Sequence, residues 1–562
     1  MSATAADRPI ELSSSRSKSW VALFCVLFLG SVFLLLYRLR EVPPGLHVDA
    51  AIKGLDAQDV LEGKLAIFFP RNYGREAMFI YSLAGMIAGG GTDRLIYGFT
   101  SVAWSWLSLA FIFRLFKLLL GTAVAALATA LLAVSFWFVH ISRVGVREPL
   151  LILAVVAPLY FLWRTLHRGL WRDAVLAGVC LGLAQYTYQP ARIIPLLVVL
   201  VCLVDWSWTR QRLRRLIASA LIALAVFLPE GVYFALHPDV AFLRQREVSL
   251  IGGSGGLLGT LRAVGQGLSS TAGMYFIRGD SHPWQNFAYR PILDPLLAAL
   301  FCAGLLLALI GWRRLSQYRW LVLWLVVMSL PSALAVEYPS DYRSYGAAPV
   351  VFIFPALALV WLYRRFGLPR ATALMAVALV GAEGYLTYHA YFQQWGPSVV
   401  TARAFDTQET AMAAFARGHP GADIYWSDIR TLAGQPVRAL EPSTQRQPWY
   451  PEDSAAIPIP ASGSGDVYYA GSPRSTIGTL AREWLPQAQV LASTPADNPR
   501  GFWAVRWPAD GRQQLLAGQH PLSASFGQDM RAVSYSVQAA GGQLNLRIFW
   551  QQIRPAGPYD LY

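Results

Sequence analysis

Long apolar runs occupy most of the first 390 residues and constrain the fold of this chain more than any other feature. Of the 562 residues, 55% are hydrophobic and 14% are charged, whereas about a quarter of the residues of a soluble protein are charged. Most of the runs are long enough to cross a bilayer, which takes about 20 residues. The runs cover residues 20–37, 93–113, 119–139, 149–166, 173–189, 190–206, 215–235, 292–311, 320–337, 347–363 and 371–390. The sequence therefore predicts an α-helical, multi-span membrane protein.

Arginines are concentrated in alternate connections between these runs, and an excess of Arg and Lys marks the cytoplasmic side of a membrane protein. The set consists of Arg164, Arg168, Arg172, Arg210, Arg212, Arg214, Arg215, Arg313, Arg314, Arg319, Arg364, Arg365 and Arg370. We therefore expect a multi-pass protein of the cell (plasma or inner) membrane, with a cytoplasmic tail at 1–19 and an uncleaved first anchor. The expected outer segments are 140–148, 186–192, 236–291, 337–346 and everything after residue 391.

Residues 77–90, AMFIYSLAGMIAGG, form a shorter apolar run that ends in glycines. If this run were a full span, an inner N-terminus would no longer agree with an outer loop at 140–148. We expect it to be a half-span or a steep helix beside the membrane. The sequence then predicts about 11 crossings, within a range of about 11–13 transmembrane helices.

The residues after 391 change in character. Expected strands alternate with expected helices at Gln408–Arg417 and Ser475–Leu485. The strands are Asp423–Ser427, Val467–Gly471, Phe502–Trp507 and, later, Leu544–Trp550. We therefore expect a membrane domain at 20–390, an α/β domain outside the membrane at 391–510, and a β-rich segment at 511–562 that is cut short at Tyr562.

Composition and missing motifs exclude several classes of function. The net charge is +14, and the arginines cluster in short loops between apolar runs. No segment resembles a nucleic-acid-binding module. The four cysteines, Cys25, Cys180, Cys202 and Cys302, each lie inside an apolar run, so that their spacing predicts neither a disulfide framework nor a metal site. The sequence contains no GxxxxGK[ST], HExxH or CxxC motif.

The polar segment 38–76 follows the first apolar run, and Pro43 and Pro44 end the helix before it. After the prolines, apolar and charged residues recur at helical spacing on two different faces. The apolar positions are Val48, Ile52 and Leu55, and the charged ones are Asp49, Lys53 and Asp56. This pattern predicts a short amphipathic helix at a membrane interface. Asp49 at its start can be a helix cap or a catalytic base.

The expected outer loops carry an unusual number of charged and aromatic residues. They include Arg143, Arg147, Glu148, Tyr188, Arg192, His282, Asn286 and Arg343. Arginine grips phosphate in bidentate fashion, so these arginines are candidates for binding an anion. Snorkelling or structural ion pairs would equally explain them. The aromatic side chains suit sugar rings, and they also suit the interfacial belt.

At about residues 20–390 the chain resembles the GT-C membrane glycosyltransferases that use polyprenyl-phosphate sugars. The resemblance is greatest to the superfamily of protein O-mannosyltransferases and aminoarabinose transferases, glycosyltransferase family thirty-nine. The motifs that carry it are GLHVDAAIKGLDA, NYGREAMFIY, SRVGVREPLL at 142–151, GLAQYTYQPARIIPLL at 182–197 and YRSYGAAPVVF at 342–352. Their order and their place at outer span ends make the set specific.

The resemblance implies a sugar donor on a lipid phosphate, an acceptor hydroxyl on protein, lipid or glycan, and a single inverting displacement. The family's catalytic base falls on Asp49. A second acid falls on Glu148, where the family more often has Asp, and Ala50 replaces the second carboxylate of the family's first loop. Candidates for the donor phosphate are Arg143, Arg147, Arg192 and Arg343, and further substrate-binding candidates are Arg75, Glu76, Tyr188, His282 and Asn286.

No cofactor or metal is required by these motifs, although Asp49, Glu148 and His282 could together hold a divalent ion. Two other classes of function share the spans and the outer arginines. One is a transporter or flippase of lipid-linked sugars, which would not need Asp49. The other is a non-catalytic envelope assembly protein whose outer tail binds partners.

Overall fold

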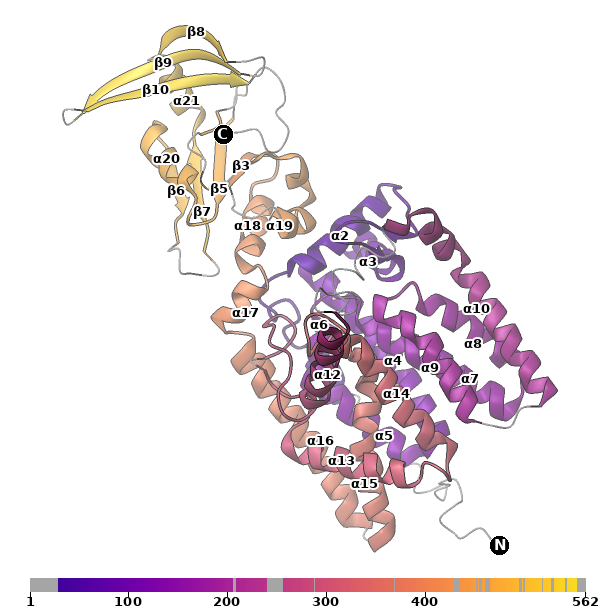
Figure 1. The fold of residues 1–562 in the computed structure, drawn as a ribbon. Helices are drawn as coiled ribbons and strands as arrows, with labels where there is room; N and C mark the ends of the chain where they lie inside the picture. Colours follow the sequence, from indigo (N-terminus) through magenta and orange to yellow (C-terminus); the bar gives the residue numbers. More distant parts are fainter. Residues whose placement is uncertain are drawn as a thin grey trace, which may run out of the picture. The chain divides into compact units, whose positions relative to one another are not determined.

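A computed structural model shows two compact units, Met1–Phe405 and Asp406–Tyr562 (Figure 1). It describes residues 29–205, 209–239, 256–287, 289–367, 369–427, 434–450, 453, 457–459, 465–494, 498, 501–517, 519–526, 530–540 and 543–552. Residues 391–405, which the sequence analysis assigned to the C-terminal part, group with the first unit. The cytoplasmic tail expected at 1–19 lies outside the described residues.

The first unit consists of helices and one short two-stranded hairpin. Its helices are α2 (Val48–Leu61), α3 (Ala77–Gly90), α4 (Arg94–Leu120), α5 (Thr122–Val134), α6 (Phe136–Arg143), α7 (Pro149–Arg168), α8 (Trp171–Ala184), α9 (Ile194–Val204), α10 (Arg210–Leu236), α12 (Gly256–Met274), α13 (Pro295–Ile310), α14 (Ser316–Ala333), α15 (Ala348–Phe366), α16 (Pro369–Tyr388) and α17 (Val399–Ala404). Short 3-10 helices lie at Gln189–Ile193 and Tyr345–Ala347, and a π-helix at His389–Trp395 extends α16. Strands β1 (Phe68–Phe69) and β2 (Arg75–Glu76) pair antiparallel.

Fewer of the described helices have the length and composition of a full span than the sequence predicted. Within the described residues, five helices are long and apolar enough to cross a membrane, or six if α5 and α6 count as one bent span. Other apolar runs form shorter helices, at Ala77–Gly90, Gln189–Val204 and Pro295–Ile310. A helix of 14 residues such as α3 is roughly 21 Å long, against a hydrocarbon core of about 30 Å. Part of the first expected span, at 20–28, lies outside the described residues.

The run 119–139, expected to be one span, breaks at Ser135. This residue has an extended backbone, with φ −70° and ψ 147°, and its hydroxyl accepts a hydrogen bond from the amide of Phe138 at 3.3 Å. Ser135 is thus the N-cap of a new helix, a common role for serine, and α6 departs from α5 at 58°. The break sends Arg143, at the end of α6, in a direction that a straight helix would not give it.

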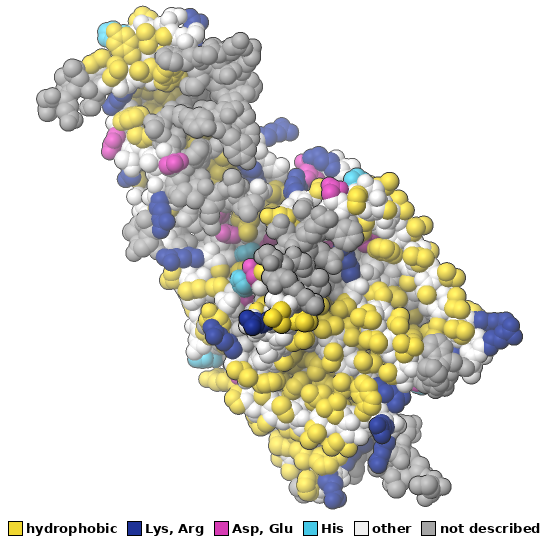
Figure 2. Space-filling view, in the orientation of Figure 1, with side chains coloured by type: hydrophobic (Ala, Val, Ile, Leu, Met, Phe, Trp, Pro, Cys, Tyr) yellow, Lys and Arg dark blue, Asp and Glu magenta, His cyan; other side chains and the backbone are white. Residues whose placement is uncertain are grey.

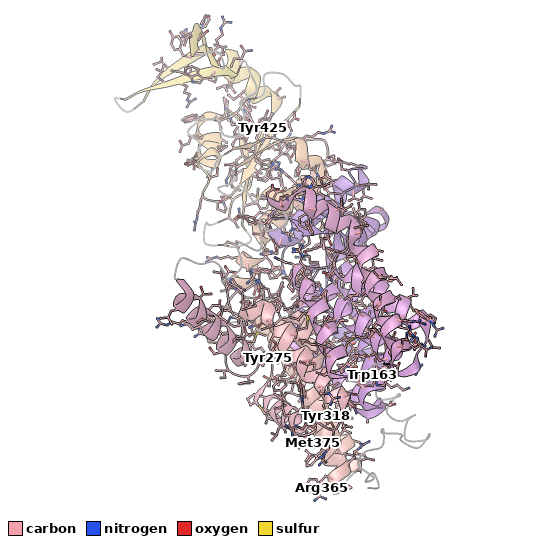
Figure 3. The ribbon with its side chains drawn as sticks, turned by 45° about the vertical axis from the view of Figure 1, so that its right-hand side comes forward. Trp163, Tyr275, Tyr318, Arg365, Met375 and Tyr425 are labelled. Carbon is pink, nitrogen blue, oxygen red and sulfur yellow. The ribbon has the colours of Figure 1, made fainter. Side chains whose placement is uncertain are left out.

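The core of the first unit lies between α5, α7, α14 and α15. Trp163 of α7, labelled in Figure 3, meets the ring of Trp320 of α14 edge-on at 5.1 Å. Gly304 lets α13 approach α15 closely, because a Cβ there would collide with the carbonyl oxygen of Phe354. These contacts are the small-residue and aromatic packing usual between membrane helices.

Helices that run in alternating directions give the first unit two chemically different ends. The arginine-rich end, comprising the connections 164–172, 209–215, 311–319 and 364–370, holds the arginines used above to assign orientation. The polar end comprises 38–76, 144–148, 185–193, 278–294 and 336–347. On the face shown in Figure 2, hydrophobic side chains cover the flank of the unit, and Lys and Arg gather at its lower and right-hand margin.

Among its described residues, the second unit contains two sheets, four α-helices and a 3-10 helix at Pro442–Arg446. The larger sheet has the strand order β4-β3-β5-β7-β6, and the smaller has the order β10-β9-β8. The strands are β3 (Asp423–Ser427), β4 (Trp449–Tyr450), β5 (Val467–Gly471), β6 (Gln489–Ala492), β7 (Trp503–Trp507), β8 (His520–Phe526), β9 (Met530–Ala540) and β10 (Gln543–Gln552), and the helices are α18 (Thr407–Gly418), α19 (Gly434–Leu440), α20 (Thr476–Trp484) and α21 (Ala509–Ala517). Tyr425, labelled in Figure 3, lies on β3 between the rings of Tyr450 and Tyr469. The strands and helices expected in this region are therefore present with nearly the expected bounds.

Candidate functional site

Helix α2 begins with a cap that is not Asp49. The ring nitrogen Nδ1 of His47 accepts a hydrogen bond from the amide of Asp49 at 3.1 Å, so that His47 is the N-cap. Burial lowers the pKa of His47 to about 4, which keeps this nitrogen free of a proton and able to accept. The carboxylate of Asp49, in the first turn of α2, is therefore not used in capping.

Two side chains from the β1–β2 hairpin orient the Asp49 carboxylate. Arg75 donates to its Oδ1 at 2.8 Å, and Asn72 donates to the same oxygen at 2.9 Å. Burial acts to raise the pKa of Asp49, but the charges of Arg75 and Lys53 hold that pKa well below its usual range. The side chain of Asp49 keeps 24% of its surface exposed. The structure thus presents an ionised, accessible carboxylate at a fixed orientation.

The charged face of α2 is buried, which corrects the amphipathic interface helix expected from the sequence. Lys53 is 1% exposed and Asp56 is 2% exposed. Arg71 covers this face, with its guanidinium at 2.7 Å from Asp56 and at 2.6 Å from Asp59. Sequence periodicity located the charged face correctly but could not show that the following hairpin folds back over it.

A second group of charged residues lies beside the group formed by Asp49, Asn72 and Arg75. It brings together four residues that the sequence predicted for the site, namely Glu76, Arg147, Tyr188 and Arg192. Arg147, in the loop between α6 and α7, pairs with Glu76 at 2.5 Å, and its guanidinium lies over the ring of Tyr188 at 4.8 Å. Arg192 is 4.0 Å from the other carboxylate oxygen of Glu76. The guanidinium of Arg192 also lies over the ring of Phe234 at 4.8 Å. Three segments far apart in the sequence therefore meet around one carboxylate.

Two buried carboxyl groups near these arginines have unused hydrogen-bonding capacity. Glu148 is 6% exposed, and its Oε2 has no hydrogen-bond partner among the described residues. Glu230 of α10 is 1% exposed, and within the described chain both of its carboxyl oxygens are without a partner. Glu148 was predicted from the sequence. Glu230 was missed, although an acidic residue within an apolar run is a recognised sign of function.

Arg143 does not lie where the sequence analysis expected it, in a site for an anion. Its guanidinium donates four hydrogen bonds of 2.7–2.9 Å to main-chain carbonyl oxygens. The acceptors belong to Leu34, Leu35, Tyr37 and Val42. The same group lies over the rings of Tyr391 and Phe392 at 5.3 and 4.9 Å. Arg143 thus binds the end of the helix before α2, whose described part is residues 29–36, and it does not belong to the candidate site.

His282, Asn286 and Arg343 lie in a separate loop cluster. The Nδ1 of His282 is 2.8 Å from Asp280, and Asn286 donates to the main-chain carbonyls of Asp280 and Arg290. Arg343 donates to the main-chain carbonyl of Glu337 at 3.0 Å. The hydrogen bond from Asp280 raises the pKa of His282.

The loop cluster touches α2 through one aromatic contact. The ring of Trp284 stacks on His47, the cap of α2, with a centroid distance of 4.4 Å and an angle of 16°. The cluster therefore supports the start of α2 through His47. In the part of the chain that the structure describes, no three His, Cys, Asp or Glu side chains form a group that could hold a metal ion. Asp49, Glu148 and His282 do not converge as a metal site would require.

A model of the family described as dolichyl-phosphate-mannose-protein mannosyltransferase matches residues 77–233. That range includes Arg147, Glu148, Tyr188, Arg192 and Glu230, whereas Asp49 lies before it. The comparison with curated proteins gives no match.

Two crystal structures of ArnT from Cupriavidus metallidurans are similar to this chain at 13% identity. One is bound to undecaprenyl phosphate and the other is in the apo state, with TM-scores of 0.53 and 0.52. Each similarity covers 88% of this chain and 99% of ArnT. The apo oligosaccharyltransferase of Archaeoglobus fulgidus has a TM-score of 0.47 at 14% identity, over 76% of this chain and 64% of its own. The two ArnT structures thus show a fold similar to that of this chain.

Proposed function

We propose that this protein is an integral membrane glycosyltransferase that moves a sugar from a polyprenyl-phosphate carrier to an acceptor hydroxyl at the polar end of the first unit. The observation that carries the proposal is the Asp49 carboxylate, which is ionised, partly exposed and held by Arg75 and Asn72. The similar ArnT structure bound to undecaprenyl phosphate supports a lipid-phosphate donor. The polar end then faces the outer side of the membrane, because the arginine-rich end has the composition of a cytoplasmic face.

The reaction is a single displacement at the anomeric carbon. The acceptor oxygen forms a bond to that carbon while the bond from the carbon to the phosphate oxygen breaks. The electron pair of the broken bond leaves on the carrier phosphate, and the proton of the acceptor hydroxyl passes to Asp49. The product sugar has inverted configuration. Buried cationic groups beside Asp49 stabilise the charge that develops on the departing phosphate.

The depressed pKa of Asp49 in the empty site has a simple relation to this chemistry. Arg75 and Lys53 lower that pKa because they stabilise the carboxylate. An anionic phosphate near the same cations would partly neutralise them and raise the pKa of Asp49 towards the range of a working base. Donor binding would thus make the carboxylate a better proton acceptor at the moment when the acceptor hydroxyl must lose its proton.

The test is Asp49→Asn, with Asp59→Asn as its matched control on the same helix. Asn keeps an oxygen for Arg75 and Asn72 but cannot accept a proton, and loss of a general base costs about 10²–10⁴-fold in rate. We expect transfer from a polyprenyl-phosphate sugar to fall by this factor, while the control, which alters the ion pairs of Asp59 with Lys64 and Arg71, keeps its rate. Carrier movement without sugar transfer by the parent protein would indicate a transporter instead.

Near-normal transfer by Asp49→Asn, measured beside a thermal melt of the same preparation, would remove Asp49 as the base. Glu148 would then be the next candidate. A reporter that is active only outside the cytoplasm, fused after Phe405, tests the orientation separately. We expect activity there, and activity of a cytoplasm-only reporter at that position would reverse the assignment of the two ends.

A further inference from the structure

A hollow of about 530 Å³ lies at the arginine-rich end of the first unit, where α13 passes into α14. Its lining combines aliphatic side chains with an indole and two guanidinium groups. The lining residues are Leu309, Ile310, Trp312, Arg313, Arg314 and Val322. None of them belongs to the candidate site at the polar end, so this hollow needs an explanation of its own.

The apolar part of the lining is open to the surroundings. Ile310 is 72% exposed and Leu309 is 49% exposed. Both lie in the last turn of α13, an apolar helix of 16 residues. Large apolar side chains exposed at the end of a membrane helix are covered by the acyl chains of lipid rather than by water. One side of the hollow is therefore suited to a hydrocarbon chain.

The two arginines of the lining stand on a hydrogen-bonded turn that follows α13. The amide of Arg314 donates to the carbonyl oxygen of Gly311 at 3.0 Å. Arg319, in the first turns of α14, donates from its guanidinium to the carbonyl oxygen of Trp312 at 3.2 Å. The turn that carries Arg313 and Arg314 is thus fastened at both ends, and it holds the two guanidinium groups beside the apolar lining.

No acidic side chain in this connection balances the charge. Segment 311–319, GWRRLSQYR, contains no Asp or Glu. Arg313 and Arg314 are exposed, and in the part of the chain that the structure describes neither forms an ion pair. Elsewhere at the same end the chain supplies an acid, since Arg164 pairs with Asp173 at 3.0 Å. The positive charge at the hollow is therefore available to a ligand.

A third helix brings a further positive charge towards the same turn. The ring of Tyr318, labelled in Figure 3, packs against Gly311, where a Cβ atom would lie 2.5 Å from it. The charge of Arg364, near the end of α15, acts on the hydroxyl of Tyr318. Helices α13, α14 and α15 thus all contribute to one cationic region next to exposed apolar side chains.

We propose that this hollow binds an anionic diacyl phospholipid, with its phosphate at Arg313 and Arg314 and an acyl chain along Leu309 and Ile310. Arginine grips phosphate in bidentate fashion, and basic pockets between membrane helices suit anionic lipid headgroups. A soluble anion would leave the aliphatic lining uncovered, whereas a lipid without net charge would leave the positive charge unbalanced. The site does not depend on the proposed function.

The experiment is native mass spectrometry of the purified full chain in detergent, titrated with dioleoyl phosphatidylglycerol. Dioleoyl phosphatidylcholine has the same chains and a phosphate but no net charge, and it serves as the reference lipid. Inorganic phosphate and undecaprenyl phosphate are added as competitors. The variant is Arg313→Gln with Arg314→Gln. Its matched control is Arg210→Gln with Arg214→Gln, which removes the same charge from exposed positions at the same end.

An arginine at a lipid headgroup contributes about fivefold to affinity. We therefore expect the Arg313 and Arg314 double variant to weaken phosphatidylglycerol binding by roughly twentyfold, and the control to stay within about twofold of the parent. The parent should bind phosphatidylglycerol more tightly than phosphatidylcholine. Without lipid, both double variants should melt like the parent, because all four side chains are exposed. Phosphatidylglycerol should raise the melting temperature of the parent and the control more than that of the variant.

Unchanged affinity in the Arg313 and Arg314 variant would overturn the proposal. Equal weakening in both double variants would do the same, because the lipid would then be held only by the general charge of this end. A lower melting temperature of the variant without lipid would make the two arginines structural. Displacement of the lipid by inorganic phosphate would overturn the assignment to a phospholipid, and displacement by undecaprenyl phosphate at equal concentration would assign the hollow to the carrier. The titration contains no sugar donor or acceptor, so failure of the proposed function would leave its result unaffected.

Discussion

The two ends of the first unit use arginine in opposite ways. At the arginine-rich end most of these side chains are exposed, as Arg210, Arg214, Arg313, Arg314, Arg364 and Arg365 are. At the polar end, Arg75, Arg143 and Arg147 are at most 2% exposed. Burying a guanidinium is costly unless every charge is matched. A buried arginine must therefore be satisfied by the fold or by a ligand, whereas an exposed one is satisfied by water.

Arg143 and Arg147 show how different two buried arginines can be. They are four residues apart, yet one grips main-chain carbonyls and the other pairs with Glu76. Nothing in the SRVGVRE segment separates the two roles. Their partners do, because four of the five N–H donors of Arg143 go to main-chain carbonyl oxygens, whereas Arg147 pairs with a carboxylate.

Arg143→Met should have the largest effect on stability. It removes four charge-assisted hydrogen bonds and leaves buried carbonyl oxygens without donors, which we expect to cost on the order of 4 kcal/mol or more. The melting temperature in detergent should fall sharply, while the protein that remains folded binds undecaprenyl phosphate normally. A well-folded Arg143→Met protein with weakened carrier binding would place Arg143 in the site and break the distinction drawn from Arg147.

The pair of Glu76 and Arg147 should behave as a unit. Each single variant, Glu76→Leu or Arg147→Met, leaves one buried charge without its partner. It should lower the free energy of unfolding by about 3–5 kcal/mol. The double variant should cost clearly less than the sum of the two, because the buried pair of Glu76 and Arg147 is removed as a whole. A double-mutant cycle of melting temperatures gives the coupling. Simple additivity would mean that Glu76 and Arg147 do not depend on each other in the folded protein.

Asp341→Asn should have a smaller effect that depends on pH. Burial, and then the charge of Asp280, raise the pKa of Asp341 well above its usual value. The folded protein thus holds a proton that the unfolded chain releases, so stability declines as pH rises from the ordinary aspartate pKa through the raised one. Each unit of raised pKa corresponds to about 1.4 kcal/mol. Melting curves from pH 4 to pH 8 should therefore be flatter for Asp341→Asn than for the parent.

His282 contributes to the same pH dependence with the same sign. Its hydrogen bond to Asp280 raises its pKa, so its stabilising effect is complete below the ordinary histidine pKa and disappears as pH rises through the raised one. Asp341→Asn should leave this part intact. An unchanged slope in the Asn variant would show that Asp341 is ionised in the folded protein.

Arg314→Met should have the smallest effect of all. The side chain is exposed at the arginine-rich end, and surface substitutions of this kind usually change stability by less than about 0.5 kcal/mol. Sugar transfer and carrier binding should equal those of the parent. A marked loss of either activity would show that the arginine-rich end takes part in the reaction, and the contrast between the two ends would fail.

The sequence predicted local features well where they depend on nearby residues. The bounds of β3, β5, α18 and α20 follow from alternating patterns and turn residues, and α3 was expected as a short helix. The break at Ser135 was missed, although serine before an apolar segment is a recognisable cap. Among the described residues, fewer helices than expected are long enough for a full span, because apolar length alone does not show where a helix ends.

The site was predicted only as a set of residues. Asp49, Arg75, Glu76, Arg147 and Arg192 were all named, but their pairing depends on a hairpin that folds back over α2. Lys53 could not be recognised from its spacing, because on a helical wheel it shares a face with two aspartates and resembles an ordinary solvated residue. Its burial beside Asp49 is visible only in three dimensions.

The hydrogen bonds from Arg143 to main-chain carbonyl oxygens also have a consequence for the synthesis of the protein. Its carbonyl partners lie 101–109 residues earlier in the chain, and translation adds about 5–20 residues per second. Roughly five to twenty seconds therefore pass between synthesis of the first helix and arrival of the side chain that fixes its end. During that interval the segment bearing Asp49 leaves the ribosome without its anchor, and it must depend on the insertion machinery or on lipid until α6 emerges.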